Sequence, residues 1–231
     1  ALFATGNFRN IQVVAKEQGI EAANAGVADL GWRMEQFSGD SKVGGGKGFS
    51  FTANEPLQMT FGDPAAYSFL AWDIVNAWRE EDISNVLRGY GEERYARKIA
   101  REITQRRRKK PIETSAELAA IVNDAVPSAY RHRRIHPATK TFQALRIAVN
   151  DELDALKEFM EGTCALLSPG GRLATISFHS IEDRIVKRAM RTLEAEGNIR
   201  RITKRPITPT DEEIRANPRA RSARLRIAEK I

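Results

Sequence analysis

An acidic residue, Asp29, stands near the end of the short apolar run 25–30 and is followed by Gly31. Such a run is typical of a buried strand. Open α/β sheets bind their ligands at the carboxyl ends of parallel strands, where a carboxylate can accept hydrogen bonds from ribose hydroxyls or an ammonium group. An Asp at a strand end can equally cap the following turn. Position alone leaves a ligand-binding and a structural role for Asp29 equally open.

A glycine-rich stretch, residues 44–48, invites comparison with phosphate-binding loops, because consecutive backbone N–H groups can hold an anion. The stretch does not match the Gly-x-x-x-x-Gly-Lys-Ser/Thr pattern, and the residues that follow it do not open an amphipathic helix. We predict a flexible surface loop here.

Metal binding and hydrolysis are both disfavoured. The three histidines, His132, His136 and His179, have no metal-ligand spacing, and the single Cys164 excludes a cysteine zinc site or a disulfide framework. His179 precedes Ser180 at the end of a predicted strand, where adjacent side chains point to opposite faces and cannot form a nucleophile–base pair. No metal site is expected.

Positive charge is concentrated in the rear of the chain. The net charge of the 231 residues is +7, and the first 80 residues hold 6 Lys+Arg against 9 Asp+Glu. A single basic run is most often a solvated face, but several of them in one chain favour nucleic acid, with contacts to phosphates rather than bases. The basic clusters lie at residues 106–110, 131–134, 200–205 and 219–226, with Tyr130 beside one of them as a possible stacking group.

The chain has no apolar run approaching the roughly 20 residues of a membrane helix, and residues 1–5 do not resemble a signal peptide. We therefore expect a cytoplasmic protein without membrane association.

Two apolar segments, 25–30 and 171–178, predict buried strands, the second one introduced by the turn signal Pro169-Gly170-Gly171. A helical pattern over 10–21 precedes the first strand, which indicates a parallel α/β sheet. Segments 199–207 and 223–231 could close the sheet as an antiparallel hairpin.

Between these segments the pattern is helical. Helices are expected from Asp63-Pro64 through 75, over 80–88, over 92–108, and over 118–126 behind the N-cap residues Thr114-Ser115. A long helix over 138–167 leads into the second strand. We predict a core formed by residues 1–62 and 138–231, with residues 63–137 as an all-helical, RNA-binding insertion.

Four long runs closely resemble one family, the bacterial ribosomal RNA small-subunit methyltransferase H family (RsmH, also called MraW). The resemblance covers essentially the whole chain, in order, with weaker matches at 48–51 and 56–59. The four runs are Gly89-Tyr90-Gly91-Glu92-Glu93-Arg94-Tyr95-Ala96, residues 136–146 (His-Pro-Ala-Thr-Lys-Thr-Phe-Gln-Ala-Leu-Arg), residues 177–187 (Ser-Phe-His-Ser-Ile-Glu-Asp-Arg-Ile-Val-Lys) and residues 217–223 (Asn-Pro-Arg-Ala-Arg-Ser-Ala).

The resemblance implies a class I, Rossmann-like fold with a helical insertion. It also implies an enzyme that uses S-adenosylmethionine to methylate the exocyclic N4 of a cytidine in the decoding region of small-subunit (16S) ribosomal RNA, as bare RNA or in the assembled subunit. The family's cofactor contacts fall on Phe8, Asp29 and Gln36. The Ser-Ser-Pro stretch that precedes the Gln in the family is replaced by residues 33–35, Arg-Met-Glu.

The family's glycine-rich cofactor loop and the acid after its next strand have no counterpart before Phe8. We therefore expect an N-terminally truncated chain whose sheet lacks that part, and which binds the cofactor poorly. The alternative function is a non-catalytic RNA-binding remnant of the family. A DNA amino-methyltransferase is weaker, because Asp29-Leu30-Gly31-Trp32 lacks the signature of that class, in which Pro-Pro-Tyr/Phe follows an Asp, Asn or Ser.

Methylation of a cytosine amino group depends on orientation of a weak nucleophile and on removal of the target base from its stack. We expect His136, Lys140 and Arg146, on the long predicted helix, to guide RNA, with helix capping and surface charge as equal alternatives. The sequence assigns no residue to accept the amino proton and does not indicate an oligomeric state.

Overall fold

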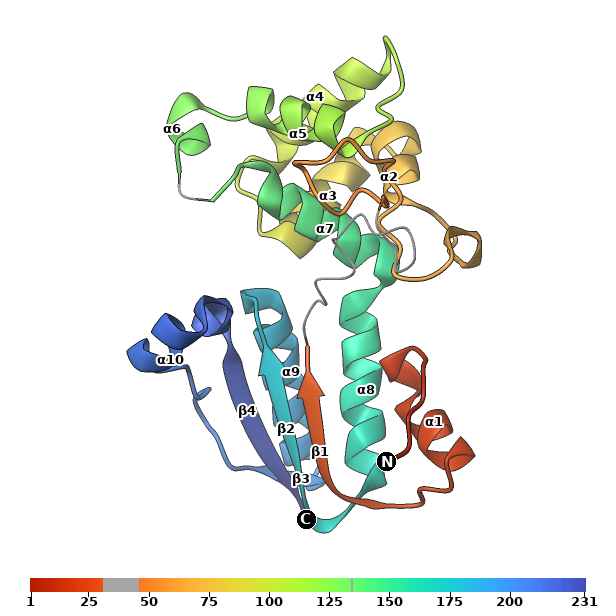
Figure 1. Cartoon of the computed structure of the whole chain (residues 1–231), viewed down its shortest axis with the longest axis vertical. Coiled ribbons are helices and arrows are strands. Elements are labelled where there is room, and N and C mark those ends of the chain that lie inside the picture. Colours follow the sequence, from red (N-terminus) through yellow and green to blue (C-terminus); the bar gives the residue numbers. More distant parts are fainter. Residues whose placement is uncertain (31–45, 134) are drawn as a thin grey trace. The chain divides into compact units, whose positions relative to one another are not determined.

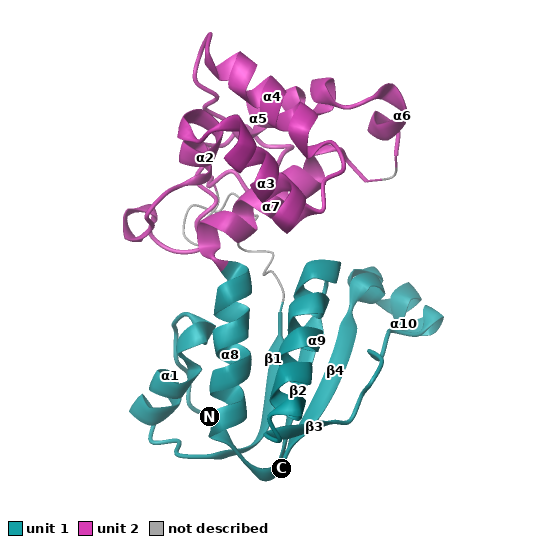
Figure 2. Cartoon of the chain, turned by 180° about the vertical axis from the view of Figure 1, so that it is seen from behind, with its two compact units in different colours: residues 1–31, 152–231 teal, residues 32–151 magenta. Residues whose placement is uncertain are grey.

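The computed structural model describes residues 1–30, 46–133 and 135–231. The chain forms two compact units (Figures 1 and 2). We call residues 1–31 and 152–231 the sheet unit, and residues 32–151 the helical unit.

The sheet unit contains a four-stranded sheet and the helices that cover it. Its elements are η1 (Phe8–Asn10), α1 (Ile11–Glu17), β1 (Ala23–Asp29), α8 (Glu152–Leu166), β2 (Leu167–Ser177), α9 (Ser180–Ala195), β3 (Ile199–Arg201), α10 (Asp211–Ala216), η4 (Pro218–Ser222) and β4 (Arg224–Lys230).

The strand order is β1-β2-β4-β3. β1 pairs with β2 in parallel, and β4 pairs antiparallel with both β2 and β3. The α/β class, the parallel pair and the closing antiparallel segments predicted from the sequence are therefore confirmed.

One face of the sheet is covered by helices. Along β2 the buried residues Leu173, Thr175 and Ser177 alternate with more exposed ones, the period expected of a strand with one packed face. Leu173 belongs to a buried cluster with Met160 of α8 and Met190 of α9. Figure 1 shows these two helices running alongside the strands.

The turn signal at residues 169–171 lies inside β2 rather than before it. The pairing of β1 with β2 shifts register there, from Ala23↔Leu167 to Ala25↔Arg172. A Cβ on Gly171 would lie 2.8 Å from the Ser168 carbonyl oxygen, so this irregularity in the strand requires glycine.

The helical unit contains helices and connecting segments, and no named strand lies in its described residues. Its elements are η3 (Pro64–Ala66), α2 (Ala71–Ala77), α3 (Glu80–Gly91), α4 (Ala96–Arg107), α5 (Ser115–Ala125), α6 (Ser128–Arg131) and α7 (Ala138–Asn150). The predicted N-cap of α5 is confirmed, because the Thr114 hydroxyl accepts the Glu117 N–H while Glu117 accepts the Thr114 N–H.

Two predicted helices are divided in the structure. The helix expected from Asp63 through 75 is a 3-10 turn followed by α2. The helix expected over 138–167 is α7 and α8, separated by Asp151 in the left-handed conformation with φ +49°. The Asn150 side chain donates to the Met59 carbonyl and accepts the Phe61 N–H. These hydrogen bonds join residues about 90 positions apart in the sequence, so the helical spacing of apolar residues could not predict the end of α7.

The unit boundaries also differ from the predicted domain limits at 62/63 and 137/138, since the division falls at 31/32 and 151/152. The reason is packing. Leu57 and Met59 are buried in the core of the helical unit, and α7 contributes Phe142 and Leu145 to the same core.

The 44–48 glycine stretch falls partly outside the described residues, and its described end is not a surface loop. Gly48 and Phe49 are buried. Gly48 has φ +80°, and a Cβ there would lie 2.4 Å from the Pro56 carbonyl oxygen. The prediction of a flexible surface loop is therefore wrong for these residues.

Candidate active site in the sheet unit

Three neighbouring strands each have a polar residue at the same edge of the sheet. Asp29 is the last residue of β1 and lies opposite Ile176, and Ser177, the last residue of β2, lies opposite Arg224, the first residue of β4. Asp29 is exposed and makes no hydrogen bond or ion pair with another described residue. A carboxylate presented in this way at the carboxyl ends of parallel strands can accept hydrogen bonds from a ligand.

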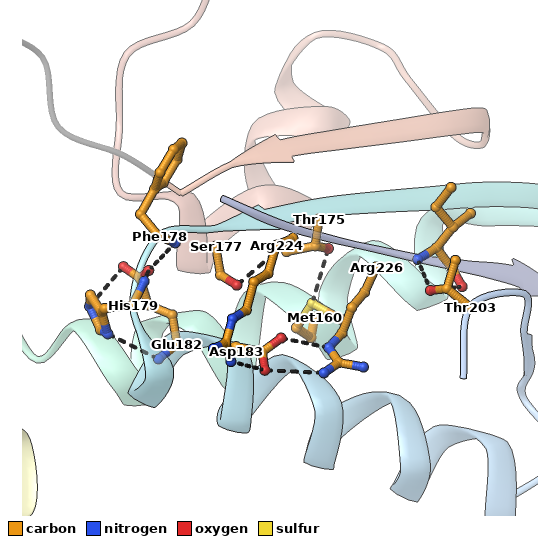
Figure 3. Close-up of polar contacts among 11 residues, drawn as sticks. Met160, Thr175, Ser177, Phe178, His179, Glu182, Asp183, Thr203, Arg224 and Arg226 are labelled. Atoms are coloured by element: carbon orange, nitrogen blue, oxygen red, sulfur yellow. Dashed lines mark hydrogen bonds and ion pairs between the residues drawn. The ribbon is translucent and has the colours of Figure 1, made fainter. Parts of the chain in front are cut away.

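A buried ion-pair network lies behind this edge (Figure 3). Asp183 of α9 accepts two hydrogen bonds from the Arg226 guanidinium, at 2.7 and 3.1 Å, and a third from Arg224 at 3.1 Å. Asp183 and Arg226 are only 6% and 5% exposed. Burial raises the pKa of the Asp183 carboxyl, but the two arginines outweigh it and hold that pKa below its ordinary value. The network fixes the start of β4 against α9.

His179 has a structural role at the same edge. It is the N-cap of α9, where its Nδ1 accepts the Glu182 N–H at 3.2 Å and Glu182 Oε2 accepts the Phe178 N–H at 2.9 Å. The prediction that His179 and Ser180 share a strand is wrong, because Ser180 is the first residue of α9.

The second ring nitrogen of His179, Nε2, lacks a hydrogen bond to any described residue. Nε2 lies 3.1 Å from Glu182 Oε1, yet it is buried and has no hydrogen bond within the described part of the chain. The short distance therefore reflects a contact without hydrogen-bond geometry, because a ring N–H donates close to the plane of the ring. The arrangement matches helix capping and offers no base for a nucleophile.

The other predicted cofactor residues are placed unequally. Phe8 is 41% exposed, and its ring packs edge-to-face on Phe159 at 5.5 Å. Phe159 belongs to the same buried cluster as Ala28, the neighbour of Asp29. Gln36 lies outside the described residues.

The predicted RNA-guiding residues all belong to the helical unit. His136 is exposed, stacks on Phe51 with ring centroids 4.4 Å apart, and accepts the Ala138 N–H through Nδ1. Lys140 donates from Nζ to the Glu92 carbonyl at 2.9 Å. Arg146 is only 8% exposed and lines a small cavity of about 190 Å³ with aromatic residues. A simple surface charge is therefore the wrong description of Arg146.

Sequence reasoning missed the Asp183–Arg226 pair and the buried Glu93, although Asp183 and Glu93 lie in runs that carry the family resemblance. The available signal was an acid on an otherwise apolar helix face, because Asp183 lies three residues before Val186 and seven before Met190. In the described residues no group of three His, Cys, Asp or Glu side chains could hold a metal ion, and no helix has the length and apolarity to span a membrane.

Comparison with known proteins settles the family. The model of the MraW methylase family matches residues 2–231. The chain belongs to the MraW methylase family.

Relatives in this family are similar along most of their length. The chain is 42% identical to ribosomal RNA small subunit methyltransferase H of Brevibacillus brevis, over 97% of this chain and 74% of that protein. It is 47% identical to the protein of the same name from Synechococcus elongatus, over 97% and 70%. The Desulfosudis oleivorans protein is 42% identical over 100% and 77%.

Membership of the MraW methylase family confirms the resemblance seen in the sequence, and makes the chain a methyltransferase that depends on S-adenosylmethionine. Among the described residues, Asp29 is the one whose position and chemistry suit that cofactor. S-adenosylmethionine carries ribose hydroxyls and an ammonium group, and Asp29 presents an exposed hydrogen-bond acceptor at the strand edge where such ligands bind.

Proposed function

We propose that this protein transfers a methyl group to the exocyclic N4 of a cytidine in the decoding region of small-subunit ribosomal RNA, in the cytoplasm. The supporting observation is the exposed Asp29 carboxylate at the ends of the parallel strands. It occurs in a chain that is 42–47% identical, over 97% of its length, to proteins named ribosomal RNA small subunit methyltransferase H.

When bound, S-adenosylmethionine supplies an electrophilic methyl group on a sulfonium. Asp29 would hold the cofactor by accepting hydrogen bonds from its hydroxyl or ammonium groups, with Phe8 and Gln36 as further contacts. The network of Asp183, Arg224 and Arg226 would keep the strand edge rigid, which favours a fixed near-attack geometry. An acceptor for one amino N–H would further localise the nitrogen lone pair.

The RNA-guiding roles remain part of the proposal. The target base must leave its stack to be methylated, and the helical unit offers His136 and Lys140 at its surface. Arg146 would act from the cavity that it lines, by supporting the aromatic residues around it.

Two matched variants test the cofactor assignment. Asp29→Asn and Glu21→Gln each remove one exposed carboxylate charge, from the carboxyl end of β1 and from just before its start. S-adenosylmethionine affinity is measured by calorimetry, and methyl transfer to small-subunit particles is measured with labelled cofactor. We expect Asp29→Asn to weaken cofactor affinity at least tenfold, about the 1.5 kcal/mol of a hydrogen bond to a charged group. Glu21→Gln should have no effect.

Equal affinities of the two variants would refute the role of Asp29. If the unaltered chain gave no heat with S-adenosylmethionine and no methyl transfer, but still bound ribosomal RNA, the methyltransferase proposal would give way to the RNA-binding remnant.

A further inference from the structure

A basic depression lies on the helical unit where α3 ends and α4 begins. It has a volume of about 310 Å³ and is lined by one tyrosine and four cationic side chains, Arg88, Arg94, Tyr95, Arg97 and Lys98. All four cationic residues are exposed. We call these five residues the basic patch.

The cations of the basic patch have no carboxylate partner among the residues that the structure describes. Instead, Arg94 and Lys98 lie over the Tyr95 ring, at 5.7 and 5.9 Å from its centroid. At the other end of α4 the situation is opposite, since Arg106 pairs with Glu102 at 3.0 Å and with Asp124 at 3.1 Å. Four adjacent, uncompensated cations repel one another and attract an anion.

The position of two of these cations is also unfavourable for the helix itself. Arg97 and Lys98 lie in the first turn of α4, which contains no acidic residue. The helix N-terminus carries partial positive charge, and carboxylates rather than cations normally stabilise it. Helix stability therefore does not account for these cations, whereas a bound anion would be attracted by both the side chains and the helix end.

The floor of the basic patch is held in place by a buried carboxylate. Glu93 is 2% exposed, and its two oxygens accept the Tyr95 N–H at 2.8 Å and the Tyr130 hydroxyl at 3.0 Å. The two tyrosine rings pack edge-to-face at 4.9 Å, and Arg133 lies 5.0 Å above the Tyr130 ring. Arg133 thus adds a fifth cation beyond the basic patch on the same aromatic support.

We propose that the basic patch binds the phosphate backbone of an RNA strand. Several cations around an aromatic support suit a polyanion that runs across the surface, and long side chains without a hydrogen-bonded geometry suit phosphates better than base edges. The choice of RNA rests on the proposed function. The patch adds a binding surface that is separate from His136 and Arg146, and it adjoins Lys140 through Glu92.

Two matched double variants test this proposal. Arg97→Gln with Lys98→Gln removes two charges from the basic patch, and Arg188→Gln with Arg191→Gln removes two exposed charges from α9 of the sheet unit, outside the four basic clusters of the sequence. Binding of a fluorescent RNA hairpin with the decoding-region sequence is measured by anisotropy at several salt concentrations, without cofactor. Polyglutamate is the second probe.

We expect the patch variant to bind RNA about 10- to 30-fold more weakly near 0.1 M salt. The slope of log affinity against log salt should also become shallower by about 1.4, because two phosphate contacts of a single strand are lost. The control variant should change affinity less than threefold. Removing cations from a helix N-terminus does not destabilise the helix, so an unchanged thermal midpoint should accompany the loss.

Equal weakening by both variants would indicate diffuse charge and overturn the proposal, as would unchanged RNA binding by the patch variant. Polyglutamate binding that was weakened as much as RNA binding would also overturn it. These measurements use no methyl donor. If RNA binding depended on the basic patch but the protein transferred no methyl group, only the proposed function would be contradicted.

Discussion

In the sheet unit, Arg224 and Arg226 donate to Asp183, Arg201 donates to Glu194 at 2.6 Å, and Arg172 and Arg200 both pair with Glu229. In the helical unit, the four cations of the basic patch have no such partners in the described structure, and the buried carboxylate beside them binds tyrosines instead. Arginines therefore stabilise the fold through ion pairs in the sheet unit, whereas the cations of the basic patch are available to a ligand.

The comparison changes how basic sequence clusters should be interpreted. Two of the four clusters noted in the sequence, 200–205 and 219–226, contribute cations to ion pairs of the sheet unit. The basic patch is not among the four clusters, because its cations are spread over Arg88–Lys98 and meet only when α3 and α4 fold. Pairing in three dimensions, and not density along the chain, identifies cations that are free for RNA.

The largest effect should come from breaking the buried network of the sheet unit. Asp183→Ala leaves Arg226 buried without its partner, so we expect a loss of about 3–5 kcal/mol in the free energy of unfolding of this unit. Urea denaturation measures the loss, and hydrogen exchange at the β2 and β4 amides should localise it. A change below about 1 kcal/mol would show that the network does not stabilise the sheet unit.

Two glycines of α3 provide a matched test of how the helical unit is packed. A Cβ on Gly91 would lie 2.5 Å from the Lys140 carbonyl oxygen, whereas a Cβ on Gly89 would meet nothing within 4 Å. Gly91→Ala should cost about 1–3 kcal/mol by forcing α3 and α7 apart. Gly89→Ala should stabilise the helix by about 0.5–1 kcal/mol. If both substitutions stabilised the protein, the close approach of the two helices would be refuted.

Acid should weaken the sheet unit through Asp183. Burial opposes ionisation of this carboxyl, but Arg226 and Arg224 lower its pKa in the folded protein. The stabilisation that comes from this lowered pKa is fully present above about pH 4, the pKa of an aspartate in the unfolded chain. It is lost as the pH falls through the pKa that Asp183 has in the folded protein. The difference in urea midpoint between the protein and Asp183→Asn should therefore shrink below about pH 4, and a difference that stayed constant to pH 2 would contradict this linkage.

A smaller effect is expected on Tyr130 in the helical unit. Burial, together with the negative charge and hydrogen bond of Glu93, raises the pKa of Tyr130 to about 12. Glu93→Gln removes the charge but keeps an acceptor, so the pKa of Tyr130 should fall. Tyrosinate absorbance in an alkaline titration gives the midpoint, with Tyr130→Phe to identify the signal. An unchanged midpoint would mean that Glu93 does not control this hydroxyl.

The smallest effect should follow loss of an exposed pair. Arg200 is 69% exposed in its side chain, and Arg172 remains beside Glu229 when it is removed. Arg200→Gln should leave the urea midpoint unchanged within error, as is usual for surface ion pairs. A shift comparable with that of Asp183→Ala would remove the distinction between buried and surface pairs in this unit.

Much of the fold could be predicted because local patterns determine it. The alternation of helix and strand around β1 gave the parallel pair, and Thr114 with Glu117 marked the start of α5. Two features could not be predicted, namely the helix break at Asp151 and the packing of residues 49–59 in the core of the helical unit. Both depend on long-range contacts such as that between Asn150 and Met59. At the candidate site, Asp29 lies at the predicted strand end, whereas the ion pair of Arg226 and the burial of Arg146 become evident only in the folded chain.

The discontinuity of the sheet unit has a consequence for biosynthesis. The helical unit is one continuous stretch, so all its residues are available once position 151 has been made. Within the described residues, the pairing partner of β1 is β2, which begins at Leu167. At translation rates of about 5–20 residues per second, β1 must wait on the order of ten seconds for its neighbour. During that interval the nascent strand, including Val27, lacks its hydrogen-bonding partner, and a chaperone that shields it should raise the yield of native protein.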